Sequence, residues 1–211
     1  MSDRFAFKVD RSLILCATLL AGCCAFSTSF GLNPAFAQAS SQTDHAPSGW
    51  LLAGSKPANY RTGIDTQMLR DGLPSAYLVS TLQDTGGFGT LMQSIQATEY
   101  AGKRIRLRAW VRSENVTDWA GLWMRVDKGS ASVGFDNMQQ RAIHGSQPWM
   151  TYDVVLDVPA DATGISFGTL LSGPGQVWLS AVKLEVVGQD VATTGGHESL
   201  PTTPVNLDFQ R

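Results

Sequence analysis

Two stretches of the chain alternate tryptophan, arginine and aspartate with apolar residues. Indole rings stack on flat apolar faces of a ligand, and guanidinium and carboxylate groups bond hydroxyls, so this combination is typical of a surface that recognises sugars. Because side chains of a strand alternate between its two faces, the polar members of each stretch share a face. We expect one binding face on two neighbouring strands, formed by Arg106, Arg108, Trp110, Trp123, Arg125 and Asp127.

Two more residues are expected near this face. Gln93 falls within a predicted strand, and Trp119 precedes the second stretch in a predicted loop. A structural role is the alternative, because Arg125 and Asp127 can form an ion pair that stabilises the protein instead of binding a ligand.

The segment Asp136-Asn137, followed by Arg141, is a second candidate site. Short Asp and Asn side chains bond the local backbone and are typical of turns. As a site, Asp136 and Asn137 would bond a ligand hydroxyl at the end of a sheet. As a structural turn, the segment would use Asp136 to hold Arg141.

Catalytic and metal sites find little support in the sequence. A glycoside hydrolase needs two positioned carboxylates, and Asp127 and Asp136 form an obvious pair whose separation nothing fixes. The histidines His45, His144 and His197 lack metal-ligand spacing. We therefore predict a non-enzymatic protein without a metal site or cofactor, and a structural Ca²⁺ held by Asp and Asn oxygens is the alternative.

Short apolar runs separated by Gly, Pro, Asp and Asn indicate strands rather than helices from residue 50 to residue 187. No long stretch has the apolar period of an amphipathic helix. The predicted strands cover residues 76–82, 88–97, 104–112, 121–127, 132–136, 152–158, 164–171 and 176–187. The sequence therefore predicts an all-β fold, an antiparallel β-sandwich.

Length and composition limit the classes of protein. The 211 residues allow one ordinary domain plus tails. The net charge of −2 and pI of about 5.9 are unlike those of a nucleic-acid-binding domain, so no nucleic-acid partner is expected. The cysteines are Cys16, Cys23 and Cys24, so the chain beyond residue 24 cannot form an internal disulfide.

The first 37 residues have the features of a secretory signal peptide. Basic residues precede an apolar stretch that starts at Leu13, and Ala35-Phe36-Ala37 provides a cleavage site before Gln38. Alternatively, Leu20-Ala21-Gly22-Cys23 resembles a lipobox in which Cys23 is lipidated. Both of these predict export to the periplasm, the cell exterior or a lipid-anchored position on the envelope, with membrane contact only through the signal peptide or the lipid. A buried N-terminal helix of the mature domain is the third alternative.

The rest of the chain divides by composition. After the signal peptide (1–37), we predict a linker at 38–48, a β-sandwich domain at 49–187, a second linker at 188–203 and an edge strand or tail at 204–211.

Several long strings, in order along residues 49–187, resemble a bacterial jelly-roll domain of the galactose-binding-like, carbohydrate-binding-module type. They include GWLLAGSKPANYRTGID (49–65), YAGKRIRLRAWVRS (100–113), WAGLWMRVDKGSASVGFDNMQQR (119–141), YDVVLDVP (152–159) and FGTLLSGPGQVWL (167–179). Domains of this type occur in exported proteins and are fused to some transcriptional regulators. The resemblance implies a jelly-roll fold and does not single out a ligand.

The C-terminus departs from the pattern of this domain type. Such domains often begin with an Asn-x-x-Phe-Glu strand before the Gly-Trp segment, and here a similar string, Asn206-Leu207-Asp208-Phe209-Gln210, ends the chain. The resemblance therefore implies that this segment completes the sheet from the other end, as in a circular permutation. A loose tail and the start of a lost second copy are the alternatives.

Three hypotheses for function follow. The first is a non-catalytic module that binds a glycan through the Trp/Arg/Asp face. The second is a module that binds another protein of the envelope. The third is a hydrolase that uses Asp127 and Asp136.

Overall fold

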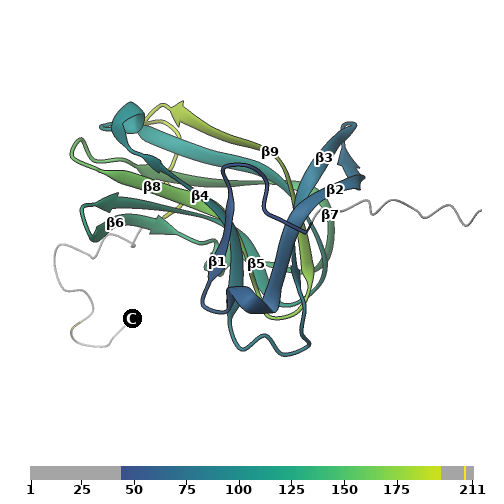
Figure 1. The fold of residues 1–211 in the computed structure, drawn as a ribbon. Coiled ribbons are helices and arrows are strands. Elements are labelled where there is room, and N and C mark those ends of the chain that lie inside the picture. The colour runs from purple at the N-terminus through teal and green to yellow at the C-terminus, as the bar shows by residue number, and fades with distance from the viewer. Residues whose placement is uncertain (1–43, 196–206, 208–211) are drawn as a thin grey trace, which may run out of the picture. The chain divides into compact units, whose positions relative to one another are not determined.

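The computed structural model describes residues 44–195 and Leu207, and its strands form two antiparallel layers joined by one long strand (Figure 1). The strands are β1 (Leu51–Gly54), β2 (Tyr60–Arg70), β3 (Leu73–Ser80), β4 (Phe88–Gln96), β5 (Arg104–Lys128), β6 (Ala131–Asp136), β7 (Ile143–Asp157), β8 (Gly164–Ser172) and β9 (Gln176–Val187). Single 3₁₀ turns lie at Pro57–Asn59, Thr98–Tyr100 and Gln139–Arg141. Within the described part, no helix is long and apolar enough to cross a membrane.

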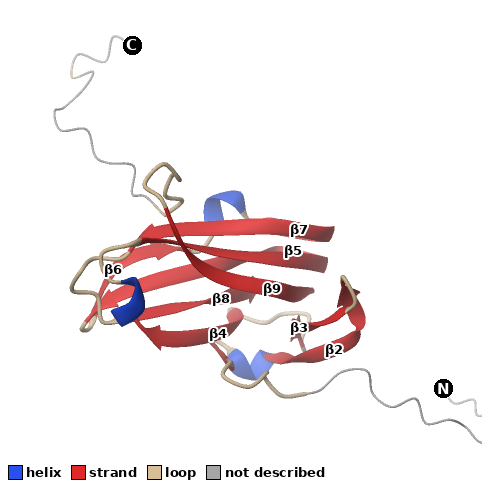
Figure 2. Ribbon diagram, turned by 90° about the horizontal axis from the view of Figure 1, so that it is seen from above, coloured by secondary structure: helices blue, strands red, loops and turns tan. Residues whose placement is uncertain are grey.

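Strand β5 belongs to both layers. Its first half pairs with β7 on one side and β9 on the other, and β9 continues to β3 and β2. Its second half pairs with β8 and β6, and β8 continues to β4 and β1. One layer is therefore β7-β5-β9-β3-β2 and the other is β6-β5-β8-β4-β1. Figure 2 shows β7, β5 and β9 side by side from above.

The two halves of β5 bury residues of opposite parity. Before residue 113 the odd-numbered side chains, such as Leu107, lie in the core, whereas after residue 119 the even-numbered ones, such as Leu122, do. The change occurs at Asn115, which has a φ of 52°, and the pairing with β7 shifts register on both sides of it. Asn tolerates this left-handed backbone better than most residues do. As a consequence, the outward side chains of the two halves lie on opposite outer faces of the sandwich.

The core lies between the layers and receives side chains from both. Leu107 and Leu78 come from the first layer, and Leu122, Met124 and Leu171 come from the second, each 1% exposed or less. Full burial of one such side chain stabilises a protein by about 1.5–3 kcal/mol. Because the chain has no cysteine after residue 24, this burial takes the place of disulfides in the sandwich.

The predicted fold class, an all-β antiparallel sandwich of the jelly-roll type, is confirmed. The strand predicted at 176–187 has the observed bounds of β9. The strands predicted at 104–112 and 121–127 were expected to be neighbours, and this is wrong, because both belong to β5. The predicted signal peptide at 1–37 and the predicted strand at 204–211, apart from Leu207, lie outside the described residues.

Candidate functional site

A groove of about 470 Å³ lies on the outer face of the second layer and crosses strands β4, β8, β5 and β6. We call it the outer groove. Its lining is mostly apolar and aromatic, with a few polar groups, which is the usual make-up of a ligand site. It is lined by Ala53, Gly54, Phe88, Thr90, Met92, Trp119, Trp123, Arg125, Phe135, Asn137, Leu170 and Ser172.

Strand register brings these residues into rows across the layer. Phe88 of β4 is opposite Ser172 of β8, which is in turn opposite Trp119 of β5. Further along β5, Arg125 is opposite Phe135 of β6. Phe88 is 38% exposed and Phe135 is 51% exposed, so an aromatic ring is open to solvent on each flank of the groove.

Trp123 forms the floor of the outer groove. Its register partner on β8 is Gly168, where a Cβ would clash with the Leu91 carbonyl oxygen, so glycine lets β4 lie close to β8. The indole Nε1 donates to Oγ1 of Thr90 on β4 at 2.7 Å, and the Thr90 hydroxyl donates to the carbonyl of Thr169 at 2.8 Å. Trp123 is only 8% exposed. It is therefore a fixed, mostly buried support, and the exposed aromatic faces are those of Phe88 and Phe135.

Asn137 enters the groove from a turn after β6. A Cβ on Gly121 of β5 would lie 3.0 Å from the Asn137 carbonyl oxygen, so glycine there lets the turn approach the sheet. The Oδ1 of Asn137 accepts a hydrogen bond from the Gln139 amide at 3.1 Å. Its side-chain NH₂ makes no hydrogen bond within residues 44–195 and so remains free to donate to a ligand.

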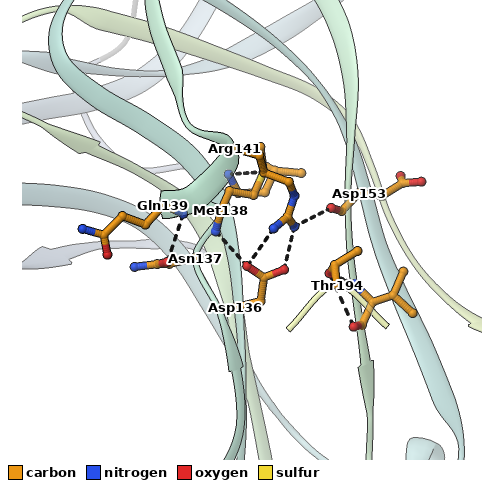
Figure 3. A network of polar contacts seen from close by, with 9 residues as sticks. Asp136, Asn137, Met138, Gln139, Arg141, Asp153 and Thr194 are labelled. Carbon is orange, nitrogen blue, oxygen red and sulfur yellow. Dashed lines mark hydrogen bonds and ion pairs between the residues drawn. The ribbon is translucent and has the colours of Figure 1, made fainter. Parts of the chain in front are cut away.

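Asp136 stabilises this turn from below, as Figure 3 shows. Its carboxylate accepts two hydrogen bonds from the Arg141 guanidinium at 3.1 and 2.6 Å and one from the Met138 amide at 2.9 Å. Met138 itself has a φ of 61° and is 1% exposed. Arg141 also donates to the carbonyl of Asp153. The structure thus agrees with the structural reading of Asp136 and Arg141, while Asn137 points to the other side and lines the groove.

Arg125 is the charged residue in the groove lining, and its charge is balanced. Its Nε lies 2.9 and 3.0 Å from the two carboxylate oxygens of Asp127, two residues along the same strand. The guanidinium side chain is 46% exposed, and its terminal nitrogens make no hydrogen bond to another described residue. Arg125 therefore offers donors to a ligand, while Asp127 orients it and is not part of the lining.

The carboxylates proposed for hydrolysis are not arranged for it. Neither Asp127 nor Asp136 lines the outer groove, and each is engaged by an arginine. A general acid and a nucleophile or base must both reach the bond that is cleaved. The described part of the groove therefore lacks the carboxylate pair of a glycoside hydrolase.

Arg106, Arg108 and Trp110 do not join the outer groove. They lie on the outer face of the other layer, so the expectation that they share a face with Trp123 and Arg125 is wrong. The cause is the change of parity at Asn115 within β5.

The arginines on that opposite face are paired. Arg106 donates to Glu185 at 2.8 and 2.6 Å, and Arg108 donates to Asp153 at 2.7 and 2.5 Å. The hydrogen bonds that Arg108 donates to the Asp153 carboxylate raise the pKa of Arg108 above its usual value. The guanidinium of Arg70 stacks 3.9 Å over the Trp110 ring. This face is an ion-paired surface rather than a hollow with free donors.

Gln93 lies on the inner side of β4 rather than on the groove side. Its Nε2 donates to the carbonyl of Gly49 at 3.0 Å, and it lines a separate cavity between the layers. The sequence reasoning also missed eight lining residues, most of them apolar and none of them part of the alternating Trp, Arg and Asp pattern. They are Ala53, Gly54, Phe88, Thr90, Met92, Phe135, Leu170 and Ser172. Alternation within a strand does not show which strands pair. Phe135 could be placed on the same face as Arg125 only from the pairing of β5 with β6.

No cluster of three or more His, Cys, Asp or Glu side chains that could hold a metal ion occurs among the described residues. The side-chain oxygens of Asp136 and Asn137 accept hydrogen bonds from backbone amides and, for Asp136, from Arg141.

Comparison with known proteins gives a curated relative and solved structures of similar fold. No protein-family model matches it. It is 45% identical over 166 residues to the uncharacterized HTH-type transcriptional regulator YbfP of Bacillus subtilis (strain 168). The match covers 77% of this chain and 56% of that protein, so the chain spans about half the length of this curated relative.

Solved structures show the same fold at low sequence identity. The enzymatically active domain of tailspike protein 4 of bacteriophage CBA120 superposes with a TM-score of 0.51 and 18% identity, covering 66% of this chain and 20% of that one. The Stig cyclase Fisc of Fischerella sp. TAU superposes with a TM-score of 0.51 and 14% identity, covering 74% and 92%. At these identities the likeness concerns the fold alone.

The CBM22-1 xylan-binding domain of Paenibacillus barcinonensis Xyn10C is also similar, with a TM-score of 0.48 and 11% identity over 68% of this chain and 89% of that one. This superposition is too weak to bear on the ligand of the present protein.

Proposed function

We propose that this protein is a non-catalytic binding module that recognises carbohydrate in the outer groove. The observation that carries the proposal is the pairing of solvent-open aromatic rings with unused hydrogen-bond donors in one hollow. Phe88 and Phe135 offer flat apolar faces, and Asn137 and Arg125 offer N–H groups between them. A sugar ring has C–H faces that pack on aromatic rings and hydroxyls that accept such hydrogen bonds.

The relative YbfP supports a role in recognition. The described part of the present chain has no α-helix, so what the two proteins share over the described part is the sandwich rather than a helix-turn-helix. A sandwich that occurs both here and in a protein named as a transcriptional regulator suits a module that binds a ligand. In YbfP, the regulatory activity would then come from the parts of that protein outside the shared sandwich.

Titration calorimetry of the full chain against a glycan panel tests the proposal. We expect at least one glycan to bind, and we expect Phe135→Ala and Asn137→Ala each to weaken that binding about tenfold, which corresponds to about 1.4 kcal/mol. Phe135 lies at the surface of β6 and Asn137 in the turn that follows it, so both variants should fold.

Trp110→Ala is the matched control, because it removes an aromatic side chain from the opposite outer face. It should leave glycan affinity unchanged. If no glycan binds and a protein recovered from an envelope fraction instead depends on Phe135 and Asn137, the module binds protein and the carbohydrate proposal fails.

We further propose that the protein meets its ligand outside the cytoplasm, because residues 1–37 combine a basic start, an apolar stretch and an Ala-x-Ala site. Intact-mass measurement of the mature protein should give the mass of a chain that begins at Gln38. A mass that corresponds to a lipidated Cys23 would instead select the lipid-anchored alternative, and an uncleaved chain in the cytoplasm would contradict export.

A further inference from the structure

One edge of strand β9 is open over most of its length. β3 pairs with β9 only from Gln176 to Leu179, whereas β5 pairs with the other edge up to Val187. From Ser180 onward no described strand lies along the β3 side, and β3 turns away from β9, as the splayed strands in Figure 1 show. The departure coincides with Ala181, which has a φ of 50°. Unpaired N–H and C=O groups along such an edge can accept another strand.

A second cavity lies beside this open edge, between the two layers, and we call it the edge cavity. Its volume is about 630 Å³. Ala181, Val182 and Leu184 of β9 form one wall, and Ile95 and Tyr100 from the other layer form another.

Core-facing side chains of β9 remain uncovered beside the edge cavity. Leu184 and Val186 are opposite Leu107 and Ile105 in the ladder, and both of those partners point into the core and are 1% exposed or less. Val186 nevertheless is 52% exposed, and Leu184 is only half-buried. A side chain on the core side of a sheet is normally covered by the facing layer and by the next strand. The sandwich is therefore incomplete at one strand position.

We propose that the C-terminal segment Val205–Gln210 of the same chain docks along this open edge of β9 as an added strand and fills the edge cavity. The segment alternates apolar and polar residues, so a strand made from it would direct Val205, Leu207 and Phe209 to one face. Leu207 is 75% exposed in the structure. Docking is thus a step that buries this side chain and covers Leu184 and Val186 at the same time.

The chain is long enough to reach the edge. The last residue described before the segment, Gly195, packs against Leu156 of β7, since a Cβ there would lie 2.5 Å from Leu156 Cδ2. Leu156 and Val186 pair with the same residue of β5, Ile105, so they lie at the same level of the sheet. The open position is three strand spacings from β7, or about 14 Å. The ten residues from Gly195 to Val205 span up to roughly 33 Å.

The charges on the outward side also match. Lys183 occupies an outward-facing position on β9, in register with Arg108. Asp208 would occupy an outward-facing position on the added strand. Opposite charges on adjacent strands favour pairing. Because Glu185 also faces outward on β9, opposite Arg106, the match holds for the register that places Asp208 beside Lys183.

Amide hydrogen exchange on the full chain tests the docking. We expect the amides of β9 from Val182 to Val187 to exchange at least tenfold faster in Leu207→Asp and in Phe209→Asp than in the unaltered protein. Asn206→Ser and Gln210→Ser are the matched controls, because they alter the outward positions of the same segment and should change exchange less than threefold. The four substitutions lie outside the sandwich, so the fold of the sandwich does not depend on them.

Each other outcome contradicts the proposal. Equal exchange of β9 in all five proteins would show that the segment does not dock. Protection that rises with protein concentration would assign the edge to the segment of a second copy. Protection that is lost in a chain lacking residues 1–43, but not in Leu207→Asp, would assign the edge to the N-terminal segment.

Discussion

Replacement of Trp123 by alanine is expected to lower the free energy of unfolding by about 3–5 kcal/mol, the usual cost of deleting a large buried aromatic side chain. Trp123 is 8% exposed, spans from β5 across β8 and donates to Thr90 on β4. Its removal would leave a cavity beneath the outer groove, so Phe88 and Phe135 would lose the surface that separates them. We therefore expect glycan binding to be lost together with stability, measured by urea unfolding and calorimetry.

Trp123→Phe separates the two effects. It retains most of the ring but removes the indole N–H, and the Thr90 hydroxyl keeps its bond to the Thr169 carbonyl. The expected cost is about 1 kcal/mol, since no buried donor is left unpaired. Trp110→Ala, on the opposite face, should cost far less than Trp123→Ala, because Trp110 is only partly buried and packs against the Arg70 guanidinium on the outer face. A similar loss in Trp110→Ala and Trp123→Ala would contradict the assignment of Trp123 as the groove floor.

The sequence predicted the fold better than it predicted the site, because alternating apolar and polar residues identify a strand without any knowledge of its neighbours. β9 and β4 have clear apolar periods between glycines and polar turns, and their bounds were close to those observed. β2 was missed because its residues YRTGIDTQMLR place few apolar side chains at alternate positions. β2 lies at the edge of a layer, where fewer side chains have to be apolar to pack against neighbouring strands.

The binding face was predicted wrongly because of the backbone conformation of one residue, Asn115. Residues 113–120, SENVTDWA, are polar enough to resemble a loop, so β5 was divided into two strands. With no sign of the left-handed Asn115, alternation could not show that Arg108 and Arg125 face opposite sides. Pairing partners such as Glu185 and Asp153 are more than 40 residues from the arginines they bind. Local patterns do not contain such contacts.

Loss of the Asp136 carboxylate is the second large effect we expect. The Asp136 side chain is 7% exposed and accepts bonds from Arg141 and from the Met138 amide. Asp136→Ala removes these acceptors and leaves the guanidinium without its counter-ion. Breaking a buried pair from one side costs about 3–5 kcal/mol, and because Arg141 is 38% exposed we expect a smaller value of about 2–4 kcal/mol, measured by urea unfolding.

Asp136→Asn tests whether the turn or the charge matters. The side-chain carbonyl of the new asparagine can still accept the hydrogen bond from the amide of Met138, the residue with the left-handed backbone. We therefore expect about half the loss of unfolding free energy seen in Asp136→Ala. Asp127→Asn is the control, because its partner Arg125 is nearly half-exposed and surface pairs contribute less than about 1 kcal/mol. Since the turn presents Asn137 to the outer groove, Asp136→Ala should also weaken glycan binding although Asp136 does not line the groove. Unchanged affinity in a folded Asp136→Ala protein would mean that the position of Asn137 does not depend on this ion pair.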